Sequence, residues 1–321
     1  MKKLLEKYPW LNLIFKYNYG LLKEEKNEKD FILGDGNITG KTVICPDGQW
    51  NKFLPTEERQ SGRLTDSMGC TGYSLLNCLE TLAKAQFGTV WNKSDRYLNK
   101  MSGTTRNGNT MSNVLETVRK NFGALKEEHW PWDIETFDWD EYYKSVPKNI
   151  QEIGKAWLKE YDLQYESVYN SKNLMKEALK YSPLYVAGYA WWKKGELYYS
   201  YAQANHCFMV FGYVEGSHWL AFDSYDEFIK KLDWDFNFAY VKSIYLTKKS
   251  LQYNVKKIKE LQARGFKYLM RPFSAGEVYE LKDDKLVKIE PQEIKDMTII
   301  SLAESKKLVG ISEELYAQLI T

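Results

Sequence analysis

The chain has 321 residues, with 45 lysines and arginines against 43 aspartates and glutamates, so its formal charge is only +2. A chain of this length can bury a large core in one large domain or two smaller ones. Its balanced charge gives no overall attraction to nucleic acid or to a membrane, so neither is expected as a partner. Four cysteines without a CxxC pair, and only three histidines, indicate free thiols in a reducing compartment and argue against a zinc site.

The N-terminus reads MKKLLEKYPWLNLIF and starts like a signal peptide. Glu6, Lys7 and Pro9 interrupt its apolar run, and no small-residue cleavage site follows, so we do not expect export by this segment. No stretch approaches the roughly 18 to 20 apolar residues that span a bilayer. We therefore expect a cytoplasmic protein, or a virion-associated one if the chain is phage-encoded.

The chain begins with a mixed region of about 60 residues, in which we expect one helix and, within GDGNITGKTVICPDG, a short strand. Three further helices are predicted after this region. The helix that begins near Tyr73 places five apolar side chains on one face: Leu75, Leu76, Leu79, Leu82 and Ala83. The next helix begins near Met111 and stops at Gly123, and the last covers Ser171 to Tyr181 with Ser171 as N-cap.

Strands are predicted after Pro183, where LYVAGYAW, CFMVFGYV, HWLAF and FAYVKSIYL form short apolar runs between turn residues. Helices followed by strands indicate an α+β arrangement rather than alternating βαβ units. The last 70 or so residues have a pattern of their own. EVYELKDDKLVKI predicts a hairpin, and SEELYAQLI predicts a terminal helix.

Cys70 is a candidate nucleophile, because DSMGCTGYSLLNCLE places it where a small-residue turn enters a helix. Unpaired N–H groups at a helix start favour negative charge, which lowers the pKa of a thiol, and they can also hold an oxyanion. The alternative is a small thiol buried where the chain turns, and for an isolated cysteine this alternative is the commoner one.

His206 and Asp223 are the candidate base and its orienting partner. His206 opens an apolar strand, and Asp223 closes the next one. If the two strands form an antiparallel hairpin, both residues lie at the same end of it, where a carboxylate can orient an imidazole. Singly, each has a structural explanation, as a strand-end hydrogen-bond partner and as a turn residue. Together with Cys70 they fit the nucleophile, base and orienter of covalent catalysis.

Several segments resemble those of the papain-like cysteine peptidases. GCTGYSLLNCLE resembles the family's cysteine helix, NHCFMVFGY its histidine strand, and WLAFDSYDE its third catalytic segment. GNTMSNVLETVRKNFGALKEEHWPW resembles its second helix and the turn after it. The interval from Cys70 to His206 is 136 residues (206 − 70), within the ~130–150 typical of the family.

The resemblance has departures at the site. Asp223 stands where the family has asparagine, Tyr225 where it has a shielding tryptophan, and Ser67 where a disulfide cysteine is common. The family's oxyanion glutamine is expected six residues before Cys70, a position that holds Leu64. Gln60 could serve instead if the loop is longer, the alternative being a solvated loop glutamine. Asp66 is expected to cap the helix, and Cys78 and Cys207 to lie in the core.

The resemblance implies a papain-like two-lobed α+β fold, with a helical lobe carrying Cys70, an antiparallel β lobe carrying His206 and Asp223, and the site in the cleft between them. It implies thiol-dependent hydrolysis of a peptide or related amide, without cofactor or metal. We predict a catalytic domain over residues 61–248, with extensions at 1–60 and 249–321 that could dock to a larger assembly. A zymogen propeptide at the N-terminus is another use of the first extension, although no motif indicates it.

Other functions stay open at this stage. A scaffold protein could keep the fold without chemistry, for example in a phage virion. A cell-wall amidase or endopeptidase, from a phage or mobile element, would use the same residues. A transglutaminase also uses cysteine, histidine and aspartate, but the long interval between Cys70 and His206 argues against it.

Overall fold

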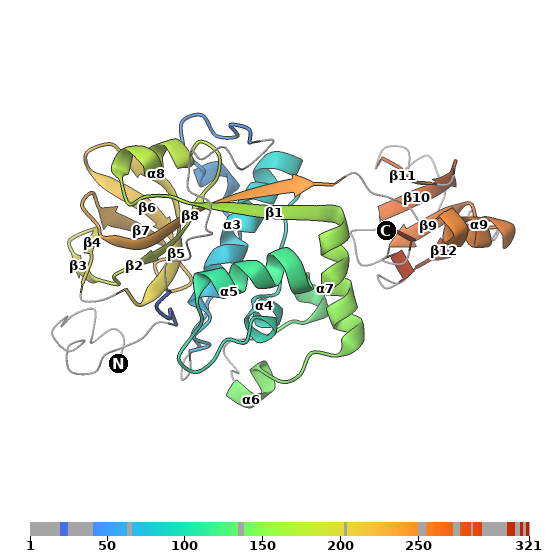
Figure 1. Cartoon of the computed structure of the whole chain (residues 1–321), viewed down its shortest axis with the longest axis horizontal. Coiled ribbons are helices and arrows are strands. Elements are labelled where there is room, and N and C mark those ends of the chain that lie inside the picture. Colours follow the sequence, from blue (N-terminus) through green and yellow to red (C-terminus); the bar gives the residue numbers. More distant parts are fainter. Residues whose placement is uncertain are drawn as a thin grey trace. The chain divides into compact units, whose positions relative to one another are not determined.

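The computed structural model describes residues 20–24, 41–62, 66–133, 138–201, 204–249, 255–271, 277–283, 285–290, 307–311, 315–316 and 319–320. Two compact units make up the chain (Figure 1). The first contains Met1–Val146 and Asp162–Thr247, and the second contains Pro147–Tyr161 and Lys248–Thr321. The division into regions 1–60, 61–248 and 249–321 stays a prediction.

An eight-stranded sheet dominates the first unit, in the spatial order β1-β8-β2-β5-β6-β7-β4-β3. The pairs β8–β2, β2–β5, β5–β6 and β6–β7 are antiparallel, whereas β4 runs parallel to β7. The strands are β1 (Tyr161–Ser167), β2 (Leu184–Gly188), β3 (Trp192–Lys194), β4 (Leu197–Tyr199), β5 (His206–Val214), β6 (His218–Phe222), β7 (Ile229–Asp233) and β8 (Phe238–Lys248).

The four predicted apolar strands are confirmed as β2, β5, β6 and β8. Strands β1 and β7 were not predicted, because YDLQYES and IKKLD interleave charged and polar residues with few apolar ones. The predicted hairpin of β5 and β6 is also confirmed, with a register shift between Val210 and Gly212. His206 and Asp223 therefore lie at the same end of adjacent strands.

The helices of the first unit are η1 (Asn51–Phe53), α3 (Cys70–Phe87), α4 (Asp95–Met101), α5 (Met111–Glu116), the π-helical η2 (Thr117–Phe122), η3 (Glu127–His129), α6 (Trp139–Tyr142) and α8 (Lys172–Ala178). Helix α3 contacts β2 and β5 as well as α4 and α5, so it lies between the sheet and the other helices (Figure 1). Every residue from Cys70 to Ala83 is buried, not only the predicted apolar face, since α3 is covered on both sides.

The predicted ends of the helices are partly right. Helix α5 begins at Met111 as predicted, where the Thr110 hydroxyl accepts a bond from the Asn113 N–H, and the helical stretch ends at Gly123 after a π-helical turn. Ser171 stands at the N-cap of α8, but its side chain makes no capping bond, and α8 ends at Ala178 rather than Tyr181.

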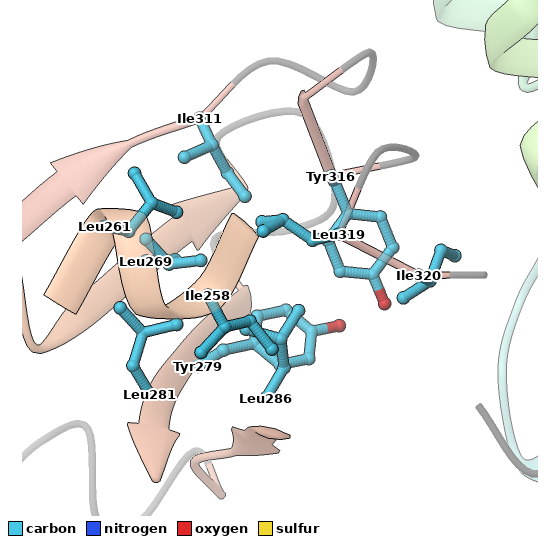
Figure 2. Close-up of a cluster of buried hydrophobic side chains, with 10 residues drawn as sticks. All are labelled: Ile258, Leu261, Leu269, Tyr279, Leu281, Leu286, Ile311, Tyr316, Leu319 and Ile320. Carbon is cyan, nitrogen blue, oxygen red and sulfur yellow. The ribbon is translucent and has the colours of Figure 1, made fainter. Parts of the chain in front are cut away.

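In the residues of the second unit that the structure describes, helices accompany a four-stranded sheet in the order β11-β10-β9-β12. The elements of this unit are α7 (Lys148–Glu160), α9 (Val255–Ala263), β9 (Tyr268–Arg271), β10 (Glu277–Lys282), β11 (Lys285–Lys288) and β12 (Leu308–Gly310). The predicted hairpin is confirmed as the antiparallel pair β10–β11. Figure 2 shows a hydrophobic core of the second unit, built from Ile258, Leu261, Leu269, Tyr279, Leu281, Leu286, Ile311, Tyr316, Leu319 and Ile320.

Some expectations fall outside the described residues. The helix expected near the N-terminus does so, and so does part of the expected helix SEELYAQLI. Of GDGNITGKTVICPDG, residues 41–48 are described, and this part contains no strand.

Candidate active site

Cys70 is the first residue of α3, and its side chain is fully buried. The start of the helix packs tightly on Asn99 of α4. A Cβ atom added to Gly69 would lie 2.2 Å from Asn99 Nδ2, and one added to Gly72 would lie 2.2 Å from Asn99 Oδ1. Glycine at both positions thus lets the two helices meet and fixes the helix start that carries the thiol.

His206 and Asp223 are brought together at the end of the β5–β6 hairpin. His206 Nε2 lies 2.7 Å from Asp223 Oδ1, and both side chains are fully buried. The same carboxylate oxygen accepts the Ser224 N–H at 2.8 Å. Since Asp223 binds Nε2, Nδ1 is the ring nitrogen left to serve Cys70, and His206 lowers the pKa of that thiol. The rings of Trp191 and Tyr225 pack against the imidazole, with centroids 5.3 and 5.1 Å away.

The surroundings of Cys70 and His206 favour a thiolate–imidazolium pair. Burial raises the pKa of Cys70, but hydrogen bonds with Cys207 and His206 and the charge of His206 outweigh it and lower the pKa from 9.0 to about 6. Burial lowers the pKa of His206, but the charge and hydrogen bond of Asp223, with those of Cys70, raise it from 6.5 to about 9. These two pKa values belong to the pair as a whole, and at pH values between them the pair is a thiolate and an imidazolium.

Lys230 is a charged residue of the site that the sequence analysis missed. Its Nζ lies 2.9 Å from Asp223 Oδ2, with 2 % of its side chain exposed. Burial raises the pKa of Asp223, but the positive charges of Lys230 and His206 hold it well below its usual range. A signal was present, because Lys230 and Leu232 share the buried face of β7. A lysine at an inward position of a strand needs a charged or polar partner.

Gln60 is fully buried, so the alternative of a solvated loop glutamine is wrong. Its Nε2 donates to Asp66 Oδ1 at 2.9 Å and to the Tyr225 hydroxyl at 2.7 Å. Its Oε1 accepts the Ser224 hydroxyl at 2.6 Å. Gln60 therefore lies beside the two residues that follow Asp223, with both amide N–H groups engaged. Leu64 lies outside the described residues.

Two minor expectations at the site are wrong or incomplete. Asp66 does not cap α3: the N-cap is Gly69, and Asp66 Oδ1 accepts the N–H of Met68, two residues on. An aspartate side chain reaches main-chain N–H groups two or three residues ahead, and α3 begins four residues after Asp66. Cys207 is buried as predicted, but its pKa is raised by Cys70 as well as by burial, whereas the pKa of Cys78 is raised by burial alone.

The segment from Gly20 to Glu24 lies beside the candidate pair. Gly20 C=O accepts the Asn109 N–H at 2.9 Å, and Leu22 N–H donates to Asn109 C=O at 2.8 Å, which makes a parallel bridge. Leu21 N–H donates to the C=O of Asn205, the residue before His206, at 3.4 Å.

Gly20 also packs on the chain that leads into α3. Its φ is +106°, and a Cβ there would lie 2.3 Å from the main-chain oxygen of Met68, two residues before Cys70. Leu21 is only 4 % exposed. Segment 20–24 therefore has neighbours flanking both Cys70 and His206.

Within the described ranges, no group of three histidine, cysteine, aspartate or glutamate side chains is arranged to hold a metal ion. No helix formed by the described residues is long and apolar enough to cross a membrane.

Comparison with known proteins gives matches only among solved structures. No protein-family model matches the chain, and no curated protein does. The cysteine protease and lectin-like domains of Cwp84, a surface layer associated protein of Clostridium difficile, match with a TM-score of 0.55 and 13% identity. Digestive procathepsin L 3 of Tenebrio molitor larval midgut matches with a TM-score of 0.50 and 16% identity.

The chain has a papain-like fold. The match to Cwp84 covers 78% of this chain and 62% of that one, and the match to procathepsin L 3 covers 74% and 78%. The predicted α+β class is confirmed. At identities of 13 and 16% the likeness carries the fold and not the activity.

Within this papain-like fold, the departures noted in the sequence have structural counterparts. Tyr225 keeps a ring against His206 and adds a hydroxyl, which donates to Asp66 Oδ2 at 2.5 Å. Ser67 is fully buried, and all four cysteines are free. Asp223 brings a negative charge to the site, beside which the positive charge of Lys230 lies.

Proposed function

We propose that this protein hydrolyses peptide bonds, with Cys70 as nucleophile, His206 as acid and base, and Asp223 as the residue that orients His206. The observation that carries the proposal is that the three side chains are all fully buried, that Asp223 binds one imidazole nitrogen at 2.7 Å, and that His206 lowers the pKa of Cys70. One solved structure of similar fold, that of Cwp84, contains a domain named a cysteine protease, which favours the same chemistry.

The reaction follows from the charge state of the pair. The Cys70 thiolate attacks the peptide carbonyl carbon, and the carbonyl electrons move to oxygen. As the tetrahedral adduct collapses, the His206 imidazolium gives its proton to the leaving amine, so a thioester and a neutral imidazole remain. His206 then takes a proton from water, whose oxygen attacks the thioester. Release of the acid regenerates the thiolate and the imidazolium.

The oxyanion has two donors in this proposal, the main-chain N–H at the start of α3 and the Gln60 amide. Such donors stabilise the charge that develops on the carbonyl oxygen. Both N–H groups of Gln60 are bonded, to Asp66 and to the Tyr225 hydroxyl. Gln60 can therefore assist only by exchanging one of these acceptors for the oxyanion.

A substrate reaches this buried pair only after part of the surrounding chain moves, and we propose segment 20–24 as that part. Cys70 and His206 are both fully buried, the segment's main chain is hydrogen-bonded to Asn205, the residue before His206, and Gly20 packs on Met68, two residues before Cys70. In the proposed enzyme, this segment is therefore a barrier that precedes catalysis.

The test compares the full chain with Cys70→Ala on unfolded protein and on a mixed library of quenched fluorescent peptides. The wild type is expected to cleave, and Cys70→Ala to lose all cleavage above background. Cys78→Ala is the matched control, because Cys78 is an equally buried thiol on the same helix, and it should retain activity. Equal cleavage by wild type and Cys70→Ala would overturn the proposal.

A second candidate is a papain-like scaffold without chemistry, favoured by one observation: the pair is fully buried and the Gln60 amide is engaged. The same assay distinguishes it when Gly20→Ala, which cannot hold segment 20–24 in place, is included. No cleavage by wild type or by Gly20→Ala supports the scaffold.

A further inference from the structure

The Asp223 carboxylate lies between two basic groups, one at each oxygen. His206 Nε2 is 2.7 Å from Oδ1, and Lys230 Nζ is 2.9 Å from Oδ2. Asp223 and His206 are fully buried, and the Lys230 side chain is 2 % exposed. A buried lysine charge needs an opposite charge beside it, and the Asp223 carboxylate provides that charge for Lys230.

The Lys230 ammonium also holds the loop after β6. Its N–H groups donate to the main-chain oxygens of Tyr225, Asp226 and Glu227 at 3.3, 2.9 and 2.7 Å, so its contact with Asp223 is ionic. This loop carries Tyr225, whose ring packs against His206. The Trp191 and Tyr198 rings face Nζ at 5.4 and 5.6 Å.

We propose that Lys230 is a positioning residue for the reaction at Cys70: its charge neutralises Asp223, and its N–H groups fix the Tyr225 loop. Asp223 and Lys230 together then present His206 with an acceptor of no net charge, as the asparagine of related sites does. This inference rests on the proposed function and names a fourth residue for it. Lys230 acts through Asp223 and Tyr225 and does not touch the reacting atoms.

The charged and titratable groups around His206 decide the expected effects. They are Cys70 from α3, Cys207 from β5, Asp223 and Tyr225 after β6, Lys230 from β7, and Asp66 beyond the Tyr225 hydroxyl. Removing the Lys230 charge leaves Asp223 negative beside His206, which favours the imidazolium. Replacing Asp223 by asparagine leaves Lys230 positive, which disfavours it.

The experiment measures the rate of Cys70 alkylation by iodoacetamide from pH 5 to 10.5, with the site mapped by mass spectrometry. The rate has a lower step, where the ion pair forms, and an upper step, where the imidazolium loses its proton. Lys230→Met should move the upper step up by about one pH unit or more, and Asp223→Asn should move it down by a similar amount. The double variant Asp223→Asn/Lys230→Met should return it to within a few tenths of a unit of the wild type.

The proposal is supported if the upper step moves in opposite directions in the two single variants and returns in the double variant. Loss of packing alone gives no reason for shifts of opposite sign. An upper step that stays in place in both single variants overturns it. If Lys230→Met does not fold, Asp223→Asn is compared with the double variant, because these two differ only at residue 230; the upper step should lie higher in the double variant, and equal steps overturn the proposal. If the wild type has its lower step near pH 6 but the upper step does not move in Lys230→Met, only this inference is rejected. Absence of the lower step in the wild type rejects the proposed function instead.

Discussion

The low pKa of Cys70 gives the sharpest test of the site, and His206→Gln is the change that should abolish it. Glutamine keeps a polar side chain of similar length but carries no positive charge. Burial raises the pKa of Cys70, and hydrogen bonding with Cys207 and His206 together with the charge of His206 lowers it, so the variant, which loses the contribution of His206, should have a thiol that titrates above pH 6.

The size of the effect follows from the thiolate fraction. With a pKa of about 6, Cys70 is about half ionised at pH 6 and almost fully at pH 8, so its alkylation rates at these pH values stand in a ratio of about 0.5. A thiol at the ordinary 9.0 gives a ratio of about 0.01. The ratio cancels the reagent's access to the buried sulfur and the lower intrinsic nucleophilicity of a weakly basic thiolate.

The assay is alkylation by iodoacetamide at the two pH values, with the modified cysteine mapped by mass spectrometry. His218→Gln is the matched control, because His218 begins β6, at the opposite end of the hairpin from Asp223, and this variant should keep a ratio of about 0.5. Cys45 should react little at either pH, since burial and Asp47 raise its pKa to about 11. A wild-type ratio near 0.01, or no change in His206→Gln, refutes the reasoning.

Three further outcomes are expected. Gly20→Ala should raise the alkylation rate of Cys70 severalfold at pH 8, because its Cβ would collide with the Met68 carbonyl oxygen, and an unchanged rate means that the segment does not limit access. Gln60→Ala should lower kcat about 10²–10³-fold if the amide holds the oxyanion, and its buried bonds predict a loss of about 1–3 kcal/mol in unfolding free energy, measured by urea titration. Cys207→Ala should move the lower alkylation step above pH 6, since its hydrogen bond lowers the pKa of Cys70; a step left at pH 6 would assign the whole shift to His206.

The residues that could be predicted are those whose environment is set by nearby sequence. Cys70 lies at a helix start because an apolar pattern follows it, and His206 and Asp223 meet because adjacent strands in an antiparallel hairpin bring their outer ends together. Four strands were predicted on the same basis, from apolar runs bounded by turn residues.

The rest depends on contacts between distant parts of the chain. Gln60 is bonded to Ser224 and Tyr225, which lie 164 and 165 positions away, so the loop pattern around it indicated solvent instead. Segment 20–24 pairs with Asn109 and Asn205, and no periodicity in its sequence reports such a bridge. Strand β7 was not predicted because two consecutive lysines interrupt the alternation of apolar and polar residues, although one of them, Lys230, is buried.

The replacement of asparagine by Asp223 is understandable once Lys230 is considered with it. In the ionic form, Cys70, His206, Asp223 and Lys230 carry alternating charges that sum to zero. A neutral amide beside a thiolate and an imidazolium gives the same sum. An aspartate without Lys230 would leave a buried negative charge, which is strongly unfavourable in a site closed to water. Under this proposal Asp223 and Lys230 together are equivalent in charge to a single amide, and replacing either of them alone shifts the pKa of His206.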